Sequence, residues 1–209
     1  VATTVRLENT TGQPLTLPSQ EWTVGTATPM DPEDNGQYVG VMWYDGKSKQ
    51  EIGQSWFDNR TLGCIPGVPR TEYRAGTSNV VWASVHNQFF ALVAMPKDPA
   101  QQIVSIMVDL PRALDGATAS GPANTPPPKG FLTAFAYPAV TLAPGQVIER
   151  QIYFFAGSKE YRTLARIADR FQNEVDAVMG FDQVFPFYKL GGFFGKALLL
   201  GMNALHTTF

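Results

Sequence analysis

The chain has 209 residues, of which 44% are hydrophobic and only 16% are charged, together with 19 Gly and 16 Pro. This length fits one domain, and the low charge with many Gly and Pro favours strands and turns over long solvated helices. A net charge of −2 without a Lys/Arg cluster argues against nucleic acid as a partner, and the single Cys64 excludes an intrachain disulfide.

Residues 1–17 show the alternation of a β-hairpin. Val1, Thr3, Val5 and Leu7 share one face of a strand, and the Asn- and Gly-containing break at 9–14 is followed by Leu-Thr-Leu. Alternating apolar residues around such a break predict two paired strands. Between residues 20 and 75 we expect shorter strands at 22–24, 38–44 and 55–57, because no helical period fits this region.

Residues 79–95 are dense in β-branched and aromatic types and stop at a proline. They predict two adjacent strands near the core, with Asn87 at their junction. Two more strands are expected at 101–110 and 130–140. The Pro-rich, unpatterned segment 111–129 between them should be an exposed and mobile loop.

After a strand at 147–155 the period changes to that of an amphipathic helix. Ser158 is its predicted N-cap and Gly180 its end. The apolar positions recur at spacings of three and four residues: Tyr161, Leu164, Ala168, Phe171, Val175 and Val178. Charged and amide side chains fill the other face, so the helix should be packed on one side only.

A second helical pattern begins at Pro186 and is rich in Phe and Leu. No window of 20 residues here lacks both Pro and charge, so the segment makes a poor transmembrane span and fits an interfacial helix better. The residues predicted to meet a membrane or a partner are Phe185, Phe187, Leu190, Phe193, Phe194 and Leu198, with Lys189 and Lys196. Gly191, Gly192 and Gly195 lack the setting of a phosphate loop and suit close helix packing.

Few side chains are candidates for catalysis. His86 and His206 are the only histidines, and their spacing does not suit a metal site. His86 is expected to be a hydrogen-bonded structural residue, and the sequons at Asn9 and Asn59 are better explained by chance than by glycosylation. The carboxylates are scattered, and their spacing leaves a glycosidase pair open. We predict no catalytic, cofactor-binding or metal residues, and no cofactor.

Four stretches together resemble the large periplasmic domain of the YidC-type (YidC/Oxa/Alb family) membrane protein insertases of Gram-negative bacteria. They are residues 5–17, 81–95, 142–161 and 164–205. Positions in register with the family pattern are Trp82, Gln88, Phe89, Phe90, Ala94, Pro144, Gly145, Gly157, Lys159 and Glu160. The chain departs from that pattern at Ser158, where the family usually has Pro, at Phe181-Asp182, and in the length of segment 111–129.

The resemblance implies an all-β dominated fold, a β-supersandwich (galactose-mutarotase-like) of antiparallel sheets with two C-terminal α-helices. Residues 1–157 would form the supersandwich domain, 158–180 the packed amphipathic helix, and 181–209 the apolar interfacial helix leading towards a transmembrane segment. Val1 would then lie inside a longer protein, with some N-terminal strands of the sandwich preceding it.

The resemblance also implies a function without catalysis. The domain would dock to translocon partners, SecDF and SecYEG, and serve nascent membrane proteins in the intact insertase. Its C-terminal helix would lie on the membrane surface, at the periplasmic face of the bacterial inner membrane.

Two alternatives stay open at this point. One is a carbohydrate-binding protein or mutarotase-like enzyme on the same sandwich, for which His86 would have to meet a carboxylate in a concave sheet. The other is a purely structural spacer between membrane helices.

Overall fold

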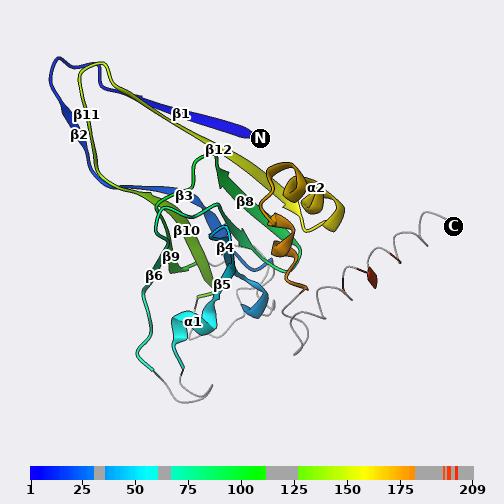
Figure 1. Cartoon of the computed structure of the whole chain (residues 1–209). Coiled ribbons are helices and arrows are strands. Elements are labelled where there is room, and N and C mark those ends of the chain that lie inside the picture. The colour runs from blue at the N-terminus through cyan, green and yellow to red at the C-terminus, as the bar shows by residue number, and fades with distance from the viewer. Residues whose placement is uncertain are drawn as a thin grey trace, which may run out of the picture. The chain divides into compact units, whose positions relative to one another are not determined.

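The structure is a computed structural model that describes residues 1–30, 36–60, 67–111 and 127–181, with the separate residues Gly195, Ala197, Leu198 and Gly201. The chain divides into two units, Val1–Ser158 and Lys159–Phe209. In the described residues the first unit is mainly antiparallel strands and the second is helical (Figure 1). Most of the predicted loop 111–129 lies outside the described residues.

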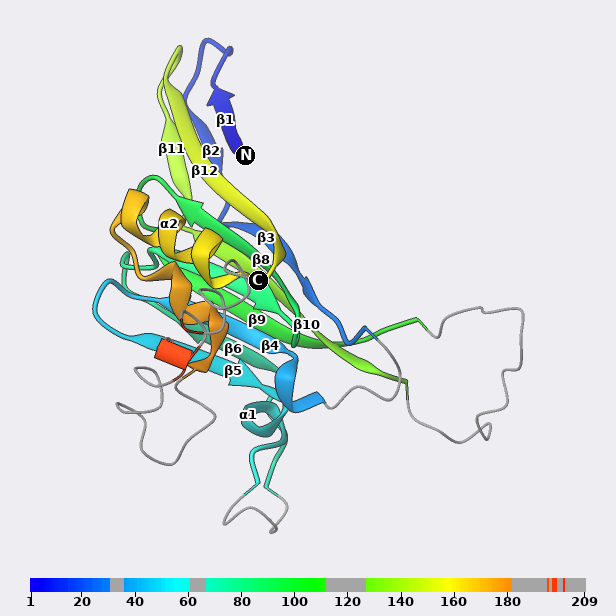
Figure 2. The same cartoon turned by 90° about the vertical axis from the view of Figure 1, so that its right-hand side faces the viewer.

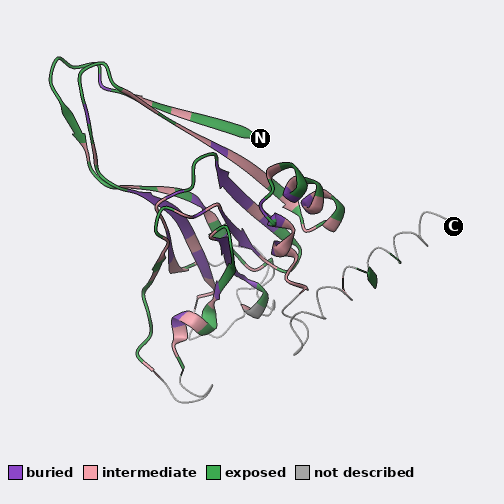
Figure 3. Ribbon diagram, in the orientation of Figure 1, coloured by how far each residue is buried: buried purple, intermediate pink, exposed green. Residues whose placement is uncertain are grey.

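Six strands of the first unit form one antiparallel sheet in the order β1-β12-β8-β7-β4-β5. Their bounds are β1 Ala2–Glu8, β12 Val147–Ser158, β8 Phe90–Pro96, β7 Trp82–His86, β4 Gly40–Tyr44 and β5 Lys49–Gly53. Every residue of β4 and β7 is buried, whereas no residue of the edge strand β1 is. Figure 3 shows this contrast between the purple central strands and the green N-terminal strand.

Four strands form a second antiparallel sheet in the order β3-β10-β9-β6, and a further pair joins β11 to β2. Their bounds are β3 Gln20–Ala27, β10 Lys129–Tyr137, β9 Gln102–Asp109, β6 Glu72–Ala75, β11 Val140–Leu142 and β2 Leu15–Leu17. The expected fold class is confirmed, since the described chain is dominated by antiparallel sheets followed by helices.

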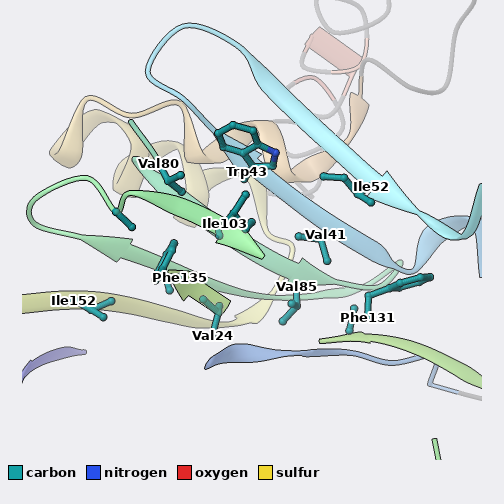
Figure 4. Packing of buried hydrophobic residues seen from close by; sticks show 14 of the residues in the cluster. Val24, Val41, Trp43, Ile52, Val80, Val85, Ile103, Phe131, Phe135 and Ile152 are labelled. Atoms are coloured by element: carbon teal, nitrogen blue, oxygen red, sulfur yellow. The ribbon is translucent and has the colours of Figure 1, made fainter. Parts of the chain in front are cut away.

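The hydrophobic core takes its side chains from both larger sheets (Figure 4). The four-stranded sheet supplies Val24, Ile103, Phe131 and Phe135, among others, and the six-stranded sheet supplies Val41, Trp43, Ile52, Val85 and Ile152. These residues are β-branched or aromatic, the types that fit a pleated and half-buried surface. The two sheets therefore form a sandwich with one shared core.

Gly25 on β3 marks a close approach between the sheets. A Cβ atom at this position would lie 2.7 Å from Leu92 Cδ2 and 3.2 Å from Val85 Cγ2. The register of β10 against β3 shifts at Thr133/Ala134, opposite this point. A Cβ atom here would force the Leu92 side chain to shift, because real Cβ atoms do not approach other carbons so closely.

Strand β12 changes partner along its length. Its first half pairs with β1 from Val147 to Tyr153, and its second half pairs with β8 from Ile152 to Ser158. The first half, together with β1, β2 and β11, forms an arm that extends from the sandwich of this unit (Figures 1 and 2).

The predicted hairpin over residues 1–17 is wrong in its pairing. Both strands exist, but β1 pairs with β12 and β2 pairs with β11. The turn signal at 9–14 shows that the chain changes direction and does not say which strands become neighbours. The partner of β1 is β12, with which it forms seven residue pairs.

Residues 55–57, predicted as a strand, lie instead in a short helix, α1 Gln54–Asp58. Asn59 follows it in the left-handed conformation, with φ 49°, which ends a helix after one turn. Phe57 is buried and stacks on Phe131 with ring centroids 5.5 Å apart. Core packing of this aromatic side chain outweighs the local strand pattern. A 3-10 turn, η1 Gly36–Tyr38, precedes β4.

Other strand predictions are confirmed. Strands β7 and β8 occupy the region 79–95, with Asn87 between them, and β9, β10 and β12 lie where strands were expected. The strand predicted at 130–140 is divided between β10 and β11.

The second unit begins with α2 Tyr161–Phe171 and continues with a 3-10 helix, η2 Val175–Met179. Ser158 is not the N-cap, because it is the last residue of β12, and Glu160 holds the cap position without a side-chain cap bond. The single helix predicted up to Gly180 is interrupted, since Gln172 and Glu174 both adopt positive φ. Leu164, Ala168, Val175 and Val178 are buried, as the periodicity predicts.

Candidate functional site

Seven of the eight residues predicted to meet a membrane or partner lie outside the described residues: Phe185, Phe187, Lys189, Leu190, Phe193, Phe194 and Lys196. The eighth, Leu198, is helical and 65% exposed. Gly195, Ala197 and Gly201 around it are also helical. A large apolar side chain that faces solvent is what an interfacial helix requires, although the interface itself stays a prediction.

Phe181 connects the start of α2 to the segment around Gly195 within the second unit. Its ring centroid lies 6.0 Å from that of Tyr161. A Cβ atom at Gly195 would lie 3.3 Å from Phe181 Cδ1, tighter than most such contacts. Gly195 thus permits a close approach, which is the packing role expected from the sequence.

No helix in the described ranges is both long enough and apolar enough to cross a membrane. Across the same ranges, no group of three or more His, Cys, Asp or Glu side chains is placed to hold a metal ion. Cys64 and His206 lie outside the described residues.

His86 and Glu51 come together in the six-stranded sheet. His86 Nε2, at the end of β7, lies 3.9 Å from Glu51 Oε1 on β5. The His86 side chain is only 4% exposed and that of Glu51 25%. A histidine and a carboxylate therefore converge, as the enzyme alternative requires, but the imidazole is closed off from bulk solvent.

A hollow of about 260 Å3 in the first unit lies where β3 and β7 end, β8 begins and β12 ends. Its lining includes Thr26, His86, Asn87, Phe90, Leu92 and Ala156. Another hollow, of about 110 Å3, lies between β1, β3, β10 and β12 and is lined by apolar side chains such as Val5, Trp22, Phe135 and Phe154.

The turn between β7 and β8 is organised by Asn87. Its Oδ1 accepts hydrogen bonds from the backbone N–H groups of Phe89 at 3.0 Å and Phe90 at 2.9 Å. Its own backbone N–H donates to the Phe90 carbonyl at 3.0 Å, and its Nδ2 donates to the Thr28 carbonyl at 3.2 Å. These four hydrogen bonds fix the conformation of the turn. The side chains of Phe89 and Phe90 in it are 53% and 46% exposed.

Asn9, noted above only as part of a sequon, has a structural role. The residue is fully buried at the far end of the arm, and its Nδ2 donates to the carbonyls of Gln13 at 2.8 Å and Leu142 at 2.9 Å. Its Oδ1 accepts from the backbone N–H of Thr11 at 3.0 Å. A side-chain nitrogen held in this way is not available for glycosylation.

Comparison with known proteins identifies the family. The model of the YidC periplasmic domain matches residues 1–177. The chain belongs to the YidC periplasmic domain family. It is therefore a periplasmic domain of a membrane protein.

A comparison with curated proteins finds no match. Among solved structures, the crystal structure of a putative aldose 1-epimerase from Escherichia coli K12 is similar at 14% identity with a TM-score of 0.36. The match covers 75% of this chain and 56% of the epimerase chain, so the chain spans little more than half the length of that protein. So distant a likeness says nothing about activity.

The positions that carry the YidC resemblance have distinct structural roles. Trp82 and Ala94 are fully buried in the six-stranded sheet, whereas Phe89 and Phe90 are exposed in the β7–β8 turn. Two separate motifs meet at the end of the arm, where the Gly145 N–H donates to the Asn9 carbonyl at 2.8 Å. Gly145 has φ 73°, which explains the glycine.

Proposed function

We propose that this YidC periplasmic domain docks an insertase to the translocon components SecDF and SecYEG and catalyses no reaction. In this proposal it also positions the insertase, for nascent membrane proteins, at the periplasmic face of the bacterial inner membrane. The match of the family model over residues 1–177 carries the proposal. The arm and the unburied edge strand β1 support it, because free backbone groups at a sheet edge are a common means of binding a partner.

The membrane contact in this proposal is made by the segment 185–198. Removal of apolar area from water stabilises such a contact by about 25 cal/mol per Å2, which suits a stripe of Phe and Leu. Lys189 and Lys196 would extend their ammonium groups towards lipid headgroups while their stems stay on the apolar side. The exposed and helical Leu198 supports this arrangement.

Flotation with vesicles of phosphatidylethanolamine and phosphatidylglycerol tests the membrane contact. The full chain should float, and removal of residues 182–209 should reduce the floating fraction. The full-length variant Leu198→Asp should reduce it in the same direction, and Thr10→Asp, which adds the same charge at an exposed position of the first unit, should not. Equal flotation of all four proteins would show that this segment is not the contact.

Docking is tested in the intact insertase. Deletion of the first unit should lower the amount of SecDF and SecYEG that co-purifies with the insertase, whereas a mere spacer could be replaced by an unrelated domain without loss. Co-purification that survives such a replacement would favour the spacer.

The second candidate, a carbohydrate-binding or mutarotase-like enzyme, is favoured by the approach of His86 to Glu51 at 3.9 Å. Anomerase activity of the purified chain, lost in His86→Ala and in Glu51→Gln, would support it. The burial of the imidazole stands against it, since a general base must reach its substrate.

A further inference from the structure

The β7–β8 turn, residues 87–90, presents two aromatic side chains in a stretch of sequence without charge. Phe89 and Phe90 are each about half exposed, although buried positions are usual for phenylalanine. The sequence has no Asp, Glu, Lys or Arg from residue 75 to residue 96. Exposed aromatic residues with no charged neighbours in sequence form a surface that water solvates poorly.

Three backbone N–H groups and one carbonyl of this turn have partners within the turn itself. Asn87 Oδ1 accepts from the N–H groups of Phe89 and Phe90, and the Phe90 carbonyl accepts from the Asn87 N–H. Transfer of such a turn out of water leaves these donors satisfied, which lowers the cost of placing irregular backbone in an apolar medium.

The segments beside the turn are uncharged as well. The Thr28 carbonyl, bound by Asn87 Nδ2, belongs to residues 22–30, and residues 151–158 contain the end of β12, where Ser158 pairs with Phe90. Neither segment contains Asp, Glu, Lys or Arg. Anionic headgroups would therefore meet no carboxylate from these three segments.

We propose that the β7–β8 turn is a membrane-contact site, in which Phe89 and Phe90 enter the interfacial region of the lipid bilayer. Lipid is favoured over a protein partner for two reasons. The chain is a periplasmic domain of a membrane protein, so a bilayer lies within its reach. The turn also lies at the end of the sheet where β12 ends, because Phe90 pairs with Ser158. Ser158 is the last residue of the first unit, and the chain continues from it into the second unit. The proposal rests on family membership and concerns residues other than the segment 185–198.

A fluorescent probe on the turn tests this proposal directly. Phe89→Cys in a Cys64→Ser background accepts a single environment-sensitive label, and Val68→Cys, at an exposed position of the first unit, is the matched control. On addition of phosphatidylethanolamine–phosphatidylglycerol vesicles, the label at position 89 should shift to shorter wavelength and be quenched by nitroxides on lipid acyl chains. The label at position 68 should show neither change.

The variant Phe89→Ser/Phe90→Ser should lower the vesicle partition coefficient of the full chain about tenfold. Phe89→Ser alone, at the more exposed position, provides the test if the double variant does not fold. Vesicle-bound protein whose label at position 89 stays in water, or partition that neither variant lowers, would overturn the proposal. The same result would leave the segment 185–198 as the membrane contact. A shift at position 89 that only a protein partner produces would also overturn it.

Discussion

The side-chain amide of Asn9 donates to the carbonyl oxygen of Leu142 at 2.9 Å, across 133 positions of the sequence. The backbone of Asn9 binds the opposite loop too, since its N–H donates to Gln146 at 3.0 Å and its carbonyl accepts from Gly145 at 2.8 Å. One buried residue therefore links the connection between β1 and β2 to the segment that joins β11 to β12.

Replacement of Asn9 by Ala should lower the free energy of unfolding by about 2 kcal/mol, because the Leu142 carbonyl loses its Asn9 donor in a buried place and the part-buried Gln13 carbonyl keeps only the Thr11 hydroxyl. Urea unfolding of the full chain measures this change. The neighbouring Thr10→Ala, at an exposed residue, should change stability by less than about 0.5 kcal/mol. Equal effects of the two substitutions would show that the Asn9 bonds contribute little.

The strands could be predicted from the sequence better than their partners. The alternation at 1–7 and the dense run at 79–95 locate β1, β7 and β8, because an inward and an outward face give each strand a period of two. Pairing depends on residues far apart, such as Asn9 and Leu142, and no local pattern encodes it. The interruption of α2 at Gln172 and Glu174 is similar, since neither residue type signals a positive φ.

Of the two candidate surfaces, only one could be predicted, and it was predicted from its composition. The apolar segment 185–198 stands out because it continues a helical period almost without charge. The exposure of Phe89 and Phe90 could not be predicted, because a Phe-rich strand usually belongs to a core and only the Asn87 turn places these two outside it.

Gly25→Ala should destabilise the first unit. The added methyl would lie 2.7 Å from Leu92 Cδ2, and overpacking of a core typically costs about 1–3 kcal/mol. Leu92→Val combined with Gly25→Ala should recover part of this loss, measured as a coupling free energy in a double-mutant cycle. Gly12→Ala is the control, since a Cβ there would meet nothing within 4 Å. Strictly additive substitutions would contradict the steric explanation.

A buried pair of hydroxyls joins β9 to β10. Ser105 Oγ and Thr133 Oγ1 lie 2.6 Å apart, and both residues are fully buried. Ser105→Ala or Thr133→Val alone should each cost about 1–3 kcal/mol, because the remaining hydroxyl loses its partner. The double variant should be closer to wild type than the sum of the two. A simple sum in the double-mutant cycle would mean that the two hydroxyls do not interact.

Tyr137 should make stability depend on alkaline pH. Burial of the phenol raises its pKa above the usual value of 10.0, an effect that Asp98 adds to and that Arg150, whose Cζ lies 3.7 Å from the ring centroid, opposes. The folded protein thus keeps this proton at a pH where the unfolded chain has released it, so the free energy of unfolding should fall as pH rises above about 10. Urea unfolding at pH 9 and pH 11 measures the fall.

Tyr137→Phe should reduce that fall, because a phenyl ring has no proton to release. A smaller dependence should remain, since burial also raises the pKa of Tyr73, whose hydroxyl accepts a hydrogen bond from Trp43 Nε1 at 3.0 Å. Tyr38→Phe, at an exposed tyrosine, is the matched control and should keep the wild-type difference between the two pH values. If Tyr137→Phe and Tyr38→Phe lose stability with pH to the same extent as wild type, the proton on Tyr137 is not linked to folding.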